Sequence, residues 1–130
     1  MRSSSAPARL AQTGFTLIEL VMVIVILSVL AAVAVPKFID LGTDAKAAAL
    51  SGIAGSLTSA SAVNYAGRKV NTGYGVAVAN CSDVASALQG GLPTGYSITS
   101  LAVAANASVT CTVTQTSTSN TANFTATGIN

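Results

Sequence analysis

Charge and histidine are scarce in this sequence. Only 8% of its 130 residues are charged, and it contains neither histidine nor tryptophan, whereas soluble domains usually carry about 25% charged residues. The lack of histidine excludes histidine-based acid–base catalysis and metal ligation by imidazole. Because the chain has only four carboxylates and no plausible base to activate a serine, we predict that it is not an enzyme and uses no cofactor.

Acidic side chains are especially rare in the second half of the chain. Asp83 is the only acid after Asp44. Calcium sites need several oxygen ligands, usually with carboxylates among them. A calcium site, or any other metal site, is therefore not expected.

The sequence does contain a long apolar run between residues 15 and 35. As a helix this run would extend about 31 Å, roughly the hydrocarbon thickness of a bilayer. Outside residues 1–35, roughly 95 residues remain for a globular part, which is small enough to need a crosslink or a partner for stability. The hydropathy of the chain therefore reflects one segment and not a large core.

Two interpretations of this run treat it as an ordinary export or anchoring segment. It could be a secretory signal peptide, because Arg2 and Arg9 precede it and residues 32–34 form a small-residue cleavage site. It could also be a plain membrane anchor with those two cations in the cytoplasm. Neither interpretation explains Glu19, because a carboxylate inside a membrane is unfavourable without a partner.

A third interpretation explains the carboxylate. If a leader of residues 1–14 is removed, cleavage after Gly14 creates a new amine on Phe15. This amine lies four residues, or about 6 Å of helix, from Glu19. In a packed filament, the amine of one copy can therefore neutralise the carboxylate of its neighbour.

The segment Gly14-Phe15-Thr16-Leu17-Ile18-Glu19-Leu20, followed by an aliphatic helix, resembles the type IV prepilin signature. The resemblance implies that a prepilin peptidase cleaves between Gly14 and Phe15 and then methylates the amine of Phe15. It also implies that Glu19 guides the docking of subunits into a helical homo-oligomeric filament.

The resemblance also implies a location and a set of partners. The precursor would sit in the bacterial inner membrane, and a pilus assembly platform, an ATPase and a secretin would deliver the mature subunit to an extracellular filament at the cell surface. Such filaments serve adhesion, motility or biofilm formation. The chain would then comprise a leader (1–14), a transmembrane and filament-core helix (15–35) and a globular pilin domain (36–130).

Loss of the leader changes the charge of the chain. The leader carries two of the six cations, so four cations and four acids remain. Because the mature side chains sum to zero, no basic patch is expected, and we predict no specific binding of nucleic acid.

Residues 36–66, beginning with Pro36-Lys37-Phe38-Ile39-Asp40-Leu41, are most similar to pilins of the mannose-sensitive haemagglutinin type. Type II secretion pseudopilins and DNA-uptake (competence) pilins share the N-terminal motif, so these are the alternative functions. Pseudopilins typically carry an acidic calcium loop near the C-terminus, whereas this chain has too few acids there. A surface pilus subunit is therefore favoured.

A proline interrupts the helical pattern after the apolar run. Pro36 removes one backbone hydrogen bond and clashes with the preceding turn. Gly42 adds flexibility nearby. We therefore predict a kink or a melted stretch within residues 33–42.

Beyond the proline, apolar and small residues recur every three or four positions. This spacing predicts an amphipathic helix that ends near Gly67, with most of this face turned toward a core. The predicted face comprises Leu41, Ala45, Ala49, Ile53, Leu57, Ala60 and Asn64, and it is widened by Leu50 and Ala54.

Residues 67–130 are predicted to be rich in β-structure, because alternating apolar residues are separated by glycine, proline and polar clusters. We predict strands at residues 75–79, 96–103, 109–114 and 123–127, and a short helix that Ser82 caps and that ends near Gln89. The fold class is therefore α+β, with one long N-terminal helix packed on a small antiparallel sheet.

The only two cysteines are Cys81 and Cys111. In an exported chain they are expected to form a disulfide, because oxidising compartments favour such bonds. In the loop-entropy model this crosslink stabilises the domain by about 3–4 kcal/mol.

Overall fold

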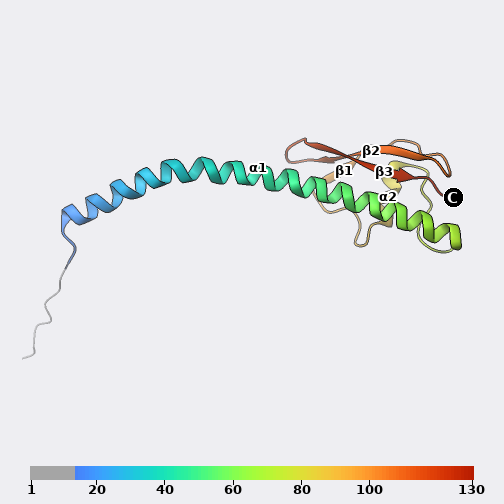
Figure 1. The fold of residues 1–130 in the computed structure, drawn as a ribbon, viewed down its shortest axis with the longest axis horizontal. Coiled ribbons are helices and arrows are strands. Elements are labelled where there is room, and N and C mark those ends of the chain that lie inside the picture. The colour runs from blue at the N-terminus through green and yellow to red at the C-terminus, as the bar shows by residue number, and fades with distance from the viewer. Residues whose placement is uncertain (1–13) are drawn as a thin grey trace, which may run out of the picture. The chain divides into compact units, whose positions relative to one another are not determined.

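The computed structural model describes residues 14–130. The predicted leader, apart from Gly14, lies outside the described residues. The chain divides into two compact units, one up to Asp40 and one comprising Leu41–Asn130. The single long helix α1, Leu17–Val70, contributes to both (Figure 1).

Helix α1 is continuous through the predicted break. Residues 33–42 are helical although Pro36 lies inside the helix, so the melted stretch is not found there. A proline removes only one hydrogen bond of the helix, and the alanines before it, at residues 31, 32 and 34, and those from Ala45 onward favour the helical conformation on either side of this stretch. A kink at Pro36 and Gly42 stays a prediction. The helix ends at Val70, slightly later than the predicted Gly67, so that Arg68 and Lys69 fall in its last turn.

The buried face of α1 agrees in part with the predicted one: Leu50, Ala54, Leu57 and Asn64 were predicted, and Ser61 was not. Its buried positions lie at spacings of four and three: Leu50, Ala54, Leu57, Ser61 and Asn64. Leu41, Ala45 and Ala49 are exposed, so the prediction that they face the core was wrong. Residues spaced four apart are rotated about the helix axis by 400°, which is about 40° beyond a full turn. A series of such residues therefore moves gradually around the helix and away from the side that faces the core.

The sheet is three-stranded and antiparallel, in the order β1-β2-β3. Its strands are β1 (Tyr96–Ile98), β2 (Ser108–Gln115) and β3 (Thr121–Thr127). In the β2–β3 pair, Cys111 lies opposite Phe124, which places both on the core face. The α+β fold class is thereby confirmed.

Two of the predicted strands are shorter or absent. Residues 75–79 form no strand, because only Val78 makes a bridge, to Ile129. Strand β1 ends at Ile98 instead of residue 103, since the chain turns there toward a bridge between Ala102 and Asn80. From Leu101 to Val103 the backbone hydrogen bonds are made with Ala79 and Cys81: the Cys81 N–H donates to the Leu101 carbonyl, and the Val103 N–H donates to the Ala79 carbonyl.

The predicted short helix is split into a 3-10 turn, η1 (Cys81–Asp83), and α2 (Val84–Ala87). Asn80 caps it instead of Ser82: the Asn80 side chain accepts a hydrogen bond from the Ser82 backbone N–H, and the Asp83 carboxylate accepts one from the Asn80 N–H at 2.8 Å. This reciprocal arrangement is a capping box, which satisfies backbone donors at the start of the turn.

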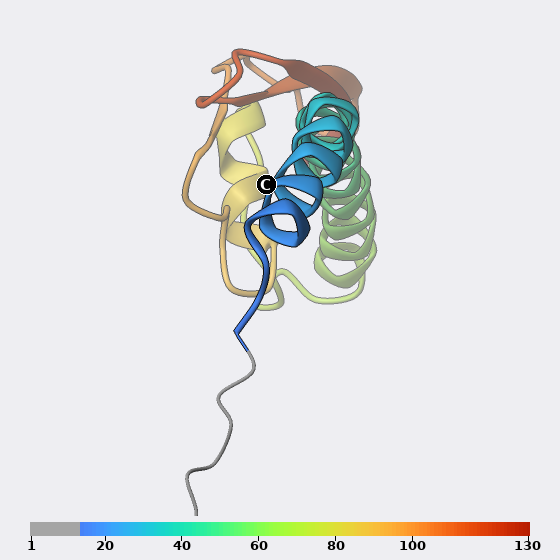
Figure 2. The ribbon, with the colours of Figure 1, turned by 90° about the vertical axis from the view of Figure 1, so that its left-hand side faces the viewer.

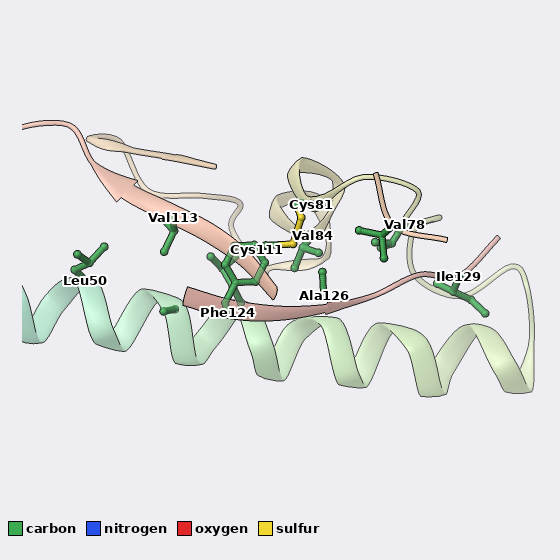
Figure 3. Packing of buried hydrophobic residues seen from close by; sticks show 12 residues of the cluster. Leu50, Val78, Cys81, Val84, Cys111, Val113, Phe124, Ala126 and Ile129 are labelled. Carbon is green, nitrogen blue, oxygen red and sulfur yellow. A yellow bond between two sulfur atoms is a disulfide. The ribbon is translucent and has the colours of Figure 1, made fainter. Parts of the chain in front are cut away.

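The core of unit 2 lies between the second half of α1, the sheet and α2. Figure 2 shows these three elements arranged around it. Leu57, Val78, Val84 and Val113 are fully buried there. The predicted disulfide is confirmed between Cys81 and Cys111 (Figure 3), and both cysteines lie in this core.

Polar side chains also attach α1 to the rest of unit 2. The Thr127 backbone N–H donates to Ser61 Oγ at 2.9 Å, and the Thr125 N–H donates to Thr58 Oγ1 at 3.2 Å. The Asn64 side chain both donates to and accepts from the Val76 backbone, at 2.8 Å each. Because these contacts are directional, they fix which face of α1 meets the sheet.

Candidate functional site: the N-terminal half of α1

The first described residues lead into α1 as non-helical backbone. Gly14, Phe15 and Thr16 precede the helix, and no neighbouring atom lies within 4 Å of a Cβ placed at Gly14. The Gly14–Phe15 peptide bond is therefore accessible and is not held in helical hydrogen bonding, as proteolytic cleavage requires.

A second capping box starts α1. The Thr16 backbone N–H donates to Glu19 Oε2 at 2.8 Å, and the Glu19 N–H donates to Thr16 Oγ1 at 3.3 Å. The Thr16 hydroxyl also donates to the same carboxylate oxygen at 2.8 Å. Both side chains thus satisfy helix donors that would otherwise lack a partner.

The two oxygens of the Glu19 carboxylate are used unequally. Both hydrogen bonds from Thr16 reach Oε2, and in the described part of the chain no hydrogen bond reaches Oε1. The side chain is exposed. One carboxylate oxygen can therefore accept a donor from another molecule without breaking the cap.

A shallow apolar hollow of about 420 Å³ adjoins the Glu19 carboxylate. Its lining consists of Phe15, Glu19, Leu20, Met22 and Val23. A carboxylate at the edge of an apolar surface favours a partner that has both an apolar body and a positive charge, because each part then meets its complement.

The remaining surface of this half of α1 is apolar. Its large aliphatic side chains are exposed along the whole length, and the Phe15 side chain is 92% exposed. The helix is long and apolar enough to cross a membrane, with a mean hydropathy of 3.0 in its most apolar window. The Ser28 hydroxyl does not interrupt this surface, because it donates to the Ile24 carbonyl at 2.6 Å within the helix.

The other residues singled out from the sequence lie elsewhere on the chain. Pro36 and Gly42 are in the helical stretch described above, and the two cysteines are in unit 2. Thr16 is the residue that sequence reasoning missed. Its spacing from Glu19 is the capping-box pattern, a threonine followed three residues later by a glutamate, and this pattern could have indicated its role.

Comparisons with known proteins agree with this geometry. Residues 9–35 match the family described as the prokaryotic N-terminal methylation motif. Over 87 residues the chain is 38% identical to the type IV narrow pilus major component PilA5 of Thermus thermophilus, an alignment that covers 67% of this chain and 69% of that protein. No solved structure matches the chain.

Proposed function

Because the chain belongs to the type IV pilin family, we propose that it is a structural subunit of a type IV pilus, an extracellular filament that serves adhesion, motility or biofilm formation. The observation that carries this proposal is the exposed apolar surface of the N-terminal half of α1. An isolated chain in water would not keep such a surface uncovered, because apolar area is driven out of water. The surface therefore requires either a membrane or other copies of the same helix.

The same surface serves the subunit in both environments. Before assembly, residues 15–35 hold the precursor in the inner membrane, since a helix of this length matches the hydrocarbon layer. In the filament they pack against the corresponding helices of other copies. Apart from the first turn and the Ala32 carbonyl, which Pro36 leaves without its helical donor, the backbone groups of this segment are paired within the helix, so either environment leaves few unpaired donors or acceptors.

Maturation is proposed to occur at the Gly14–Phe15 bond. A prepilin peptidase cleaves this bond and methylates the new Phe15 amine. The accessible, non-helical backbone of these residues supports the proposal. We also propose that an assembly platform, an ATPase and a secretin deliver the mature subunit to the cell surface. Within the family, residues 36–66 favour a pilin of the mannose-sensitive haemagglutinin type.

Subunit docking is proposed to join the Phe15 amine of one copy to Glu19 of its neighbour. The hollow beside Glu19 supports this pairing, because an N-terminal phenylalanine supplies both the apolar body and the positive charge that the hollow favours. The Oε1 atom of Glu19 is available to accept the amine while Oε2 keeps the cap.

The decisive experiment is to shear protein from the cell surface and determine its intact mass and N-terminal sequence. We expect filaments whose subunit starts at methylated Phe15 and is two hydrogens lighter because of the disulfide. A Gly14→Leu variant should keep its leader and form no filaments, because a bulky side chain would occupy the cleavage position, whereas Ala11→Leu should be processed normally. A surface protein that starts near Val35, or that still carries Met1, would refute the proposal.

A further inference from the structure

We draw no further inference here: the strongest candidate, the exposed stripe of small side chains along α1 from Ala45 to Ala66, carries none, because nothing in residues 14–130 shows what covers it.

Discussion

Removal of the disulfide should destabilise unit 2 strongly. Cys81 and Cys111 are separated by 30 residues, and the loop-entropy relation for a loop of this length predicts a loss of about 3.6 kcal/mol in the free energy of unfolding. For a domain of this size, each 1 kcal/mol shifts the melting temperature by about 4–8 °C. A Cys81→Ala, Cys111→Ala double variant should therefore melt roughly 15–25 °C below the parent.

The assay should report on unit 2 alone. All three tyrosines of the chain, Tyr65, Tyr74 and Tyr96, lie in this unit, so near-ultraviolet circular dichroism of the detergent-solubilised full chain follows its unfolding. The parent measured with and without reductant provides the control, because a buried disulfide should resist reduction until the domain opens. A fall of less than about 5 °C in the double variant would refute the loop-entropy argument.

Two further substitutions test the capping box and a tight turn. Glu19→Val should reduce the yield of sheared pili about tenfold or more relative to Thr16→Ala. The Thr16→Ala variant is the control, because it removes a cap hydroxyl that stabilises the helix by about 1 kcal/mol but keeps the Glu19 carboxylate. Equal yields from the two variants would show that Glu19 only caps the helix. Gly75→Ala should destabilise unit 2 by about 1–3 kcal/mol, because Gly75 has a φ of 69° and an added Cβ would clash with the Asn64 side chain. Gly90→Ala, at a φ of 87° with open space around it, is the control and should lower the same melting temperature less.

The sequence allowed prediction of the features that depend on local pattern. The apolar run and the alternation around Cys111 predicted the first half of α1 and strand β2, because both depend on neighbours within a few residues. The disulfide followed from the presence of a single pair of cysteines.

The features that could not be predicted depend on distant parts of the chain. The burial of Ser61 and the exposure of Leu41, Ala45 and Ala49 depend on where β3 meets α1, at Ser61 and Thr58, and these two contacts span 66 and 67 residues of sequence. Residues 75–79 have the composition of a strand, yet Val78 bridges only to Ile129 near the C-terminus. Strand pairing of this kind is set by tertiary contacts, which local propensity does not record.

The hydrogen bonds from β3 to hydroxyl groups of α1 limit how closely packed subunits can pair through their sheets. Strand β3 ends the sheet, and an edge strand with unpaired N–H groups is a template for pairing with another chain. Two of the outward-facing N–H groups of β3 already have acceptors, because Thr125 donates to the Thr58 hydroxyl and Thr127 donates to the Ser61 hydroxyl. Helix α1 thus covers the position at which another strand would pair. In closely packed subunits this prevents strand exchange and amyloid-like stacking at this edge of the sheet.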